Sequence, residues 1–109
     1  MAVTIDAIRT AIQANQWRFS THARYNAVAR RIIEADLLAA LGTGEIIEDY
    51  PTDPRGASAL VLCTGAAGRP LHAVCTIDPG GTLLIITTYE PEAPWWVDTR
   101  TRTPKGGNT

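Results

Sequence analysis

Apolar residues recur at helical spacing in the first part of the chain. Ile5, Ile8 and Ile12 lie at positions i, i+3 and i+7, which predicts an amphipathic helix of about ten residues. Thr4 precedes this pattern and can accept a hydrogen bond as the N-cap. The helix is expected to end before a short extended link, Trp17–Phe19.

A second helical pattern begins after this link. Ser20 or Thr21 can act as its N-cap, and His22 lies in the first helical turn. The apolar positions continue at helical spacing to the glycines at 42 and 44, and they are Ala23, Ala27, Val28, Ala29, Ile32, Ile33, Leu37, Leu38 and Leu41. The pattern allows either one helix through Arg31 or two helices with a break there.

After residue 44 the pattern changes to that of strands. Four runs of apolar and β-branched residues alternate with turns that contain proline or glycine, and these runs are 45–50, 57–64, 71–77 and 82–89. Successive side chains of a strand point to opposite faces, so His72 is expected on the face opposite to Leu71 and Ala73. The sequence predicts an α+β fold with two or three N-terminal helices packed on one face of a four-stranded, mainly antiparallel sheet.

The sheet is expected to end at Pro91 and Pro94, because proline cannot continue a strand ladder. The tryptophan pair at 95–96 is expected to fold back over the core, since burial of large aromatic side chains is favourable. From Thr99 onward the residues are mostly polar and predict a flexible tail. The expected organisation is one α+β domain over residues 1–98 and a tail over residues 99–109.

The composition favours a small protein without a cofactor. The chain has 109 residues, enough for one domain with one hydrophobic core. It contains no apolar run long enough to cross a bilayer and no secretory leader, so a cytoplasmic protein that does not bind membranes is expected. Cys63 and Cys75 are expected to be free thiols, with a disulfide as the minor alternative. Their spacing predicts no metal site, and no cofactor is expected.

Charge is unevenly distributed along the chain, although the net charge is −1. Residues 1–33 carry a net charge of +4, and residues 34–53 carry −6. Nine of the ten basic residues are arginine, whose guanidinium binds phosphate and carboxylate in a bidentate geometry. The arginines could therefore bind an anionic ligand, or they could pair with the acidic segment and solvate helix surfaces. The acidic net charge argues against indiscriminate binding to nucleic acid.

Four motifs, in this order along the chain, resemble a prokaryotic family called domain of unknown function 4258. They are Phe19–Ala23, Gly44–Pro51, Gly68–His72 and Ile85–Pro91, and the resemblance extends over residues 17–96. In its order of helices followed by a sheet, the family is similar to the RelE and BrnT group of toxin-antitoxin ribonucleases. The resemblance implies a RelE-like toxin layout, and it does not by itself establish an activity.

The family pattern implies a set of polar residues, which in this chain are His22, Arg30, Glu45, Tyr50, Arg69, His72 and Tyr89. The chain departs from the pattern at Asn26, where an arginine is usual, and at residues 31–33, where a Gly-Ile-Ser helix start is usual. The first departure removes a cation from the second helix, and Arg24 is the nearby residue that could replace it.

RelE-like ribonucleases cleave RNA, which needs a base for the 2′-hydroxyl, an acid for the leaving 5′-oxygen and cations around the phosphate. The resemblance implies a catalytic set of His72, Arg69 and Tyr89, without a metal. His72 would be the base or the acid, because an imidazole titrates near neutral pH. Arg69 would stabilise the anion, and Tyr89 would orient the nucleophile or stack on a base.

RNA binding is expected to involve His22, Arg24 and Arg30. A helix N-terminus favours a bound anion, and His22 lies in the first turn of the second helix. Arg69 and His72 are expected to converge at an open, water-accessible edge of the sheet. Each residue also has a structural alternative, because the histidines can be hydrogen-bonded within the fold and the arginines can be solvated or paired.

The leading hypothesis is a toxin-like domain that binds RNA or the ribosome and acts as a metal-independent endoribonuclease, with an antitoxin protein as its partner. One alternative is a non-catalytic module that binds a protein through Trp95 and Trp96. Another is a degenerate toxin that keeps the fold without the chemistry. The oligomeric state is left open between a monomer and a homodimer.

Overall fold

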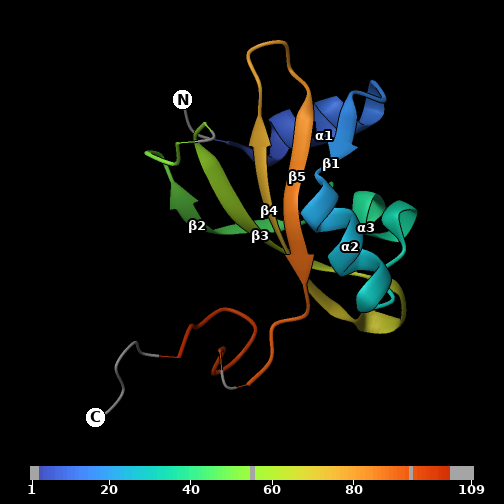
Figure 1. Cartoon of the computed structure of the whole chain (residues 1–109), viewed down its shortest axis with the longest axis vertical. Helices are drawn as coiled ribbons and strands as arrows, with labels where there is room; N and C mark the ends of the chain where they lie inside the picture. Colours follow the sequence, from blue (N-terminus) through green and yellow to red (C-terminus); the bar gives the residue numbers. More distant parts are fainter. Residues whose placement is uncertain (1–2, 55, 94, 104–109) are drawn as a thin grey trace.

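Figure 1 shows a computed structural model, which describes residues 3–54, 56–93 and 95–103. Over these residues the chain forms three α-helices and five strands, so the α+β class is confirmed. The elements in chain order are α1 (Ile5–Gln13), β1 (Trp17–Phe19), α2 (Thr21–Ala29), α3 (Glu34–Leu41), β2 (Glu45–Tyr50), β3 (Ser58–Thr64), the 3-10 turn η1 (Ala66–Gly68), β4 (Pro70–Ile77) and β5 (Leu83–Tyr89). None of the helices described is long and apolar enough to cross a bilayer.

The strands form one mixed sheet in the order β1-β5-β4-β3-β2. Strands β2 to β5 are antiparallel neighbours, as predicted, whereas β1 pairs with β5 in parallel, with Phe19 opposite Ile85. The prediction of four strands is therefore wrong, because residues 17–19 form an edge strand and not a link. Three residues are too few for a recognisable alternation, and their partner strand lies near the other end of the sequence.

Side-chain caps define where the first two helices begin. Thr4 Oγ1 accepts a hydrogen bond from Ala7 N (3.1 Å), which confirms the predicted N-cap of α1. Ser20 Oγ accepts one from Ala23 N (2.9 Å) and donates to Ile86 O of β5 (2.7 Å). Ser20 therefore caps α2 and fixes the start of this helix to the sheet.

The helical structure is interrupted between α2 and α3, so this part of the chain forms two helices and not one. Arg31 adopts a positive φ of 57°, the left-handed conformation that ends many helices. Ile32 N then donates to Ala27 O (2.8 Å), which satisfies one of the last carbonyl groups of the helix.

This break also changes which residues are buried. Val28 is 76% exposed and Ile33 is 63% exposed, so these two apolar positions of the helical pattern do not belong to the core. Ala23 and Ala27 are the buried residues of α2. Val28 is rotated by about 100° from Ala27 around the helix axis and so points away from the sheet.

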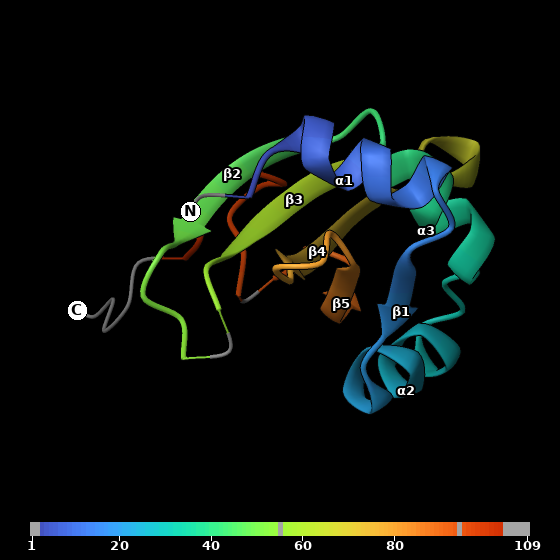
Figure 2. The same cartoon turned by 90° about the horizontal axis from the view of Figure 1, so that it is seen from above.

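The helices cover one face of the sheet, and the hydrophobic core lies between these layers (Figure 2). Both layers contribute fully buried side chains, which include Ile8, Leu37, Leu41, Val61, Ala73, Leu83 and Ile85. In β4, Leu71 and Ala73 belong to this core and His72 does not, as the alternation predicts. Cys63 and Cys75 are free and buried, and burial raises the pKa of the Cys63 thiol to about 12.

Residues 95–103, which we call the C-terminal segment, fold back against the sheet below β5 in the view of Figure 1. Val97 N donates to Thr101 O (2.8 Å), and Trp96 and Arg102 form an isolated β-bridge. Trp96 is buried, as predicted for the tryptophan pair. Trp95 is 67% exposed, so for this residue the prediction is wrong.

The first part of the predicted tail contacts the sheet. Thr99 O lies 2.7 Å from His72 Nε2, and Arg100 Nη1 lies 2.6 Å from Glu45 Oε1. These contacts hold residues up to 103 against the domain. The rest of the predicted tail, and Pro94, lie outside the described residues.

A close approach at the turn between α3 and β2 requires glycine at position 44. A Cβ there would lie 2.7 Å from Val61 Cγ1 and 3.0 Å from Leu62 O, whereas a Cβ at Gly42 would meet only Ala39 O, at 3.8 Å. We expect Gly44→Ala to lower the free energy of unfolding by about 1–3 kcal/mol, because overpacking strains a core. Gly42→Ala, the matched control, should be neutral or slightly stabilising. Urea denaturation measures both effects, and equal effects at the two positions would contradict the packing argument.

Candidate functional site

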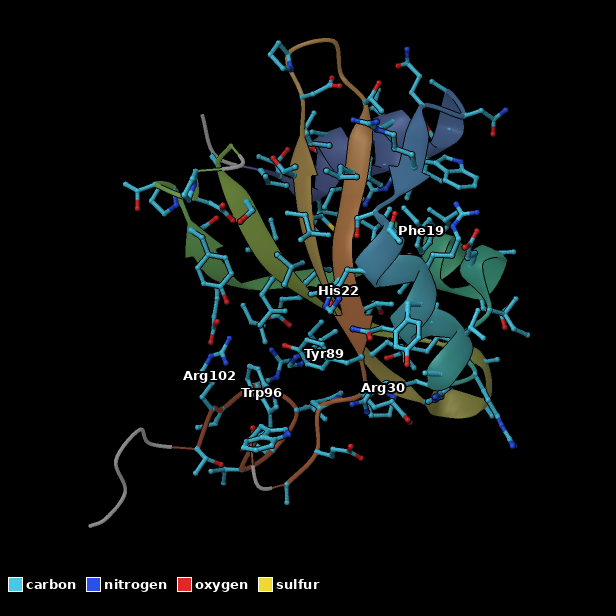
Figure 3. The ribbon with its side chains drawn as sticks, in the orientation of Figure 1. Phe19, His22, Arg30, Tyr89, Trp96 and Arg102 are labelled. Atoms are coloured by element: carbon cyan, nitrogen blue, oxygen red, sulfur yellow. The ribbon has the colours of Figure 1, made fainter. Side chains whose placement is uncertain are left out.

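A pocket of about 350 Å³ lies between α2, the end of β5 and the C-terminal segment, and we call it the α2 pocket. It is lined by cationic, acidic, polar and aromatic side chains, namely His22, Asn26, Arg30, Thr87, Tyr89, Glu90, Glu92, Trp95, Trp96 and Arg102. Figure 3 shows His22, Arg30, Tyr89, Trp96 and Arg102 gathered in this part of the molecule. The pocket thus brings α2 together with two later segments, the end of β5 and the C-terminal segment, which follow one another in the chain.

The first turns of α2 supply a polar wall of the pocket. Asn26 Nδ2 lies 3.3 Å from His22 Nε2 and donates to Thr87 Oγ1 of β5 (3.1 Å). An amide nitrogen only donates, so Nε2 of His22 accepts and the proton of the neutral ring lies on Nδ1. Asn26, which stands where the family pattern has arginine, therefore joins His22 to the sheet and adds no charge.

Arg30 supplies a cation at the C-terminal end of α2. Its Nη1 lies 3.2 Å from Glu92 Oε1, and the two side chains are 40% and 57% exposed. Ion pairs so exposed to water contribute little to stability. Arg30 can therefore exchange this carboxylate for another anion at small cost.

Arg69 contacts the end of α2 from outside the pocket. Its guanidinium donates to the main-chain oxygens of Arg30 (2.5 Å) and Arg31 (2.9 Å), and its Nε donates to Glu90 Oε2 (2.8 Å). The hydrogen bond from Arg69 lowers the pKa of the Glu90 carboxyl. A cation at a helix C-terminus also complements the helix dipole, so these contacts stabilise the end of α2.

His72 lies beneath the pocket and is fully buried. Its Nε2 is 2.7 Å from Thr99 O, and because a carbonyl only accepts, Nε2 carries the ring proton. Nδ1 then accepts from the Tyr89 hydroxyl at 3.4 Å. The rings of Trp96 and Tyr89 lie edge-on to the imidazole, with centroids 4.4 and 5.3 Å away. Burial lowers the pKa of His72, although the Thr99 carbonyl and the Glu48 charge act in the opposite direction.

The expectation that His72 is open to water is therefore wrong. The C-terminal segment, which the sequence pattern presents as a tail, covers the ring and engages Nε2, while Tyr89 engages Nδ1. Arg69 does not meet His72 at an open edge either, because its guanidinium is directed to α2 and Glu90. In this structure His72, Arg69 and Tyr89 do not surround one accessible space.

The C-terminal segment is fastened to β2 by Arg102. Its guanidinium donates to both carboxylate oxygens of Glu48, at 3.0 Å each, and to the Tyr50 hydroxyl at 3.2 Å, while that hydroxyl donates to Glu48. Arg102 also lies 4.7 Å from the centroid of the Trp96 ring, a cation–π distance. Burial acts to raise the pKa of Glu48, but the hydrogen bonds from Arg102 and Tyr50 outweigh it and lower this pKa. Burial and the Glu48 contact raise the pKa of Tyr50 to about 12.

The predicted RNA-binding residues are divided between two sides of α2. His22 and Arg30 line the α2 pocket, whereas Arg24 lies on the outer side, where its Nε is 3.6 Å from Glu34 Oε2. Sequence reasoning missed Arg102 as a pocket residue. The stretch around Arg102 has no periodicity, and the preceding tryptophan pair was the only signal that the chain returns to the sheet.

The pocket suits a ligand that is both anionic and aromatic. Arg30 offers an exchangeable cation, and Trp95 offers an exposed aromatic face. Among the residues that the structure describes, no group of three or more His, Cys, Asp or Glu side chains is placed to hold a metal ion.

Comparison with known proteins identifies a family whose description gives no function. The model of a family described as a domain of unknown function (DUF4258) matches residues 19–90. No curated protein and no solved structure matches the chain. The matched residues contain α2, α3 and strands β2 to β5, whereas the C-terminal segment lies beyond them.

The burial of neutral His72 makes stability depend on pH. Its folded-state pKa lies below the unfolded value of about 6.5, so this contribution is complete above that pH and is lost as the pH falls toward the folded-state pKa. We expect the urea midpoint to be constant between about pH 7 and 8 and to fall toward about pH 5. His72→Gln should remove this decrease, and His22→Gln, which changes the exposed histidine, should retain it. The same decrease in wild type and His72→Gln would show that another group causes it.

Proposed function

This chain belongs to the family described as domain of unknown function 4258, and from the α2 pocket we propose that it is a toxin-like domain that binds single-stranded RNA. The observation that carries the proposal is the gathering of Arg30, His22 and Trp95 around one pocket. A nucleotide presents an anionic phosphate and a flat base, and these side chains can bind both parts. A RelE-like layout is part of the same proposal.

The phosphate is assigned to Arg30. Its exposed pair with Glu92 leaves the guanidinium free to form bidentate hydrogen bonds with phosphate oxygens. His22 lies eight residues earlier, in the first turn of α2 and about 12 Å away along the helix axis. Its imidazole N–H can donate a hydrogen bond to a neighbouring nucleotide of the RNA. The two residues would thus contact different nucleotides.

The base is assigned to Trp95. This side chain is 67% exposed although it borders a pocket, and an indole face that remains in water is available for stacking. Stacking of a base on an aromatic side chain contributes about 1–3 kcal/mol and tolerates any base. The proposal therefore favours unpaired RNA, whose bases are free to stack.

The burial of His72 removes the main catalytic candidate of the ribonuclease hypothesis. With His72 sealed, His22 is the one remaining histidine of the two in the sequence. Cleavage without a metal needs a base and an acid on opposite sides of the phosphate, and one imidazole supplies one of them at a time. The geometry therefore supports binding without cleavage, which corresponds to the degenerate-toxin alternative.

Binding should depend on Arg30 and Trp95. We expect Arg30→Ala and Trp95→Ala each to weaken binding of a fluorescein-labelled, single-stranded RNA oligonucleotide by about tenfold, measured by fluorescence anisotropy at low salt. Arg18→Ala removes the same charge at β1, outside the pocket, and should leave the affinity unchanged. With one phosphate neutralised, log K should fall with log salt at a slope of about −0.7. Equal losses for Arg30→Ala and Arg18→Ala would show that the pocket does not bind the RNA.

The same oligonucleotide tests for cleavage. We expect it to stay intact on a denaturing gel after incubation with the wild-type protein and a chelator, because the pocket offers a single accessible imidazole. Cleavage by the wild type that disappears in His22→Ala would contradict binding without chemistry and would identify His22 as catalytic. His72→Gln, which replaces the buried ring, should also leave the oligonucleotide intact.

A further inference from the structure

The outer face of α2 is apolar where a surface helix is usually polar. Tyr25 is 72% exposed and Val28 is 76% exposed, and both point away from the buried residues Ala23 and Ala27. A hollow of about 510 Å³ lies over this face, and it is lined by Phe19, Thr21, Arg24, Tyr25 and Val28. Neighbouring apolar side chains that stay in water after folding mark interaction surfaces.

The spacing of the lining residues fits a helix as the ligand. Thr21, Arg24, Tyr25 and Val28 lie at i, i+3, i+4 and i+7, so they form one stripe about 10 Å long. Apolar side chains repeating at the same spacing on a second helix can enter the grooves of such a stripe. Phe19, whose ring is nearly buried, forms the floor of the hollow.

The hollow contains one charged side chain, and this side chain is positive. Arg24 lies within the stripe, and its 3.6 Å contact with Glu34 is too long and too exposed to contribute much. Arg31 lies outside the hollow, two residues beyond the end of α2, and its side chain forms no ion pair with the residues that the structure describes. A partner helix that lies along the stripe and extends beyond its end can therefore meet two guanidinium groups.

We propose that the outer face of α2 binds an acidic amphipathic helix of a partner protein. Apolar side chains of that helix enter the hollow beside Tyr25 and Val28, and its carboxylates pair with Arg24 and Arg31. The α2 pocket lies on another side of the same helix, so this site does not depend on RNA binding.

A second copy of this chain is the alternative occupant, and charge argues against it. In a two-fold dimer the same surface meets itself, so the Arg24 side chains of both copies would approach one another. None of the described residues that line the hollow is acidic, and Glu34, which contacts Arg24 at 3.6 Å, lies outside it. An acidic partner gains attraction from the same residues.

A displayed library of random peptides of about 20 residues, long enough to form a helix, tests the proposal with the full chain as target. We expect the selected peptides to be acidic, with apolar residues at helical spacing, and Tyr25→Ser/Val28→Ser to weaken their binding at least about tenfold. Arg24→Glu should weaken the acidic peptides and favour variants with lysine in place of glutamate. Val97→Ser, a matched control on an exposed apolar residue of the C-terminal segment, should bind like the wild type.

Several results would overturn the proposal. The first is that the selected peptides are neutral or basic. The second is that Tyr25→Ser/Val28→Ser leaves their binding unchanged, and the third is that the selection yields no binding peptide. A dimer in light scattering that the double variant dissociates would identify a second copy as the occupant. Both replaced side chains are exposed, so an unchanged melting temperature shows that the fold is intact, and unchanged RNA binding separates this site from the α2 pocket.

Discussion

The hydrogen bond between His72 Nε2 and the Thr99 carbonyl is the contact on which the candidate site depends. It holds the C-terminal segment against the face of the sheet that the helices leave uncovered, where Trp96 packs on the imidazole. Because the imidazole is buried, loss of the Thr99 carbonyl contact would leave a polar ring nitrogen unsatisfied, at a cost of about 1–3 kcal/mol. Without this segment the α2 pocket would lose the wall that contains Trp95, Trp96 and Arg102.

The helix α2 serves three surfaces at once, and its sequence shows how. Ala23 and Ala27 are small, so the helix lies close to β5, and the Ser20 cap fixes its start to the same strand. His22 and Asn26 follow one side and face the α2 pocket, whereas Tyr25 follows the outer side. Residues several positions apart on α2, such as His22 and Asn26, line the same pocket, whereas the neighbouring Tyr25 lines the other hollow. The side of the helix on which a residue lies therefore decides which ligand it could contact.

Local patterns predicted most of the fold. The period of the isoleucines and the cap at Thr4 were sufficient for α1, and the turns rich in proline and glycine were sufficient for β2 to β5. The parallel pairing of β1 could not be predicted, because it joins three residues to a strand at the other end of the sequence. A buried, hydrogen-bonded His72 was one of two alternatives, and the sequence could not decide between them, since the covering segment has no hydrophobic periodicity and is held by polar contacts.

The ion pairs of the site bear on the proposal that a chain of net charge −1 binds an anionic ligand. Arg102 donates hydrogen bonds to both carboxylate oxygens of Glu48 and also contacts the Trp96 ring, so releasing it would disturb the C-terminal segment. Arg30 holds Glu92 through one exposed contact, which water and salt weaken. The two arginines therefore differ in role although both line the pocket. Arg102 positions the aromatic wall, and Arg30, whose contact with Glu92 is exposed, is the cation to which the proposal assigns the phosphate.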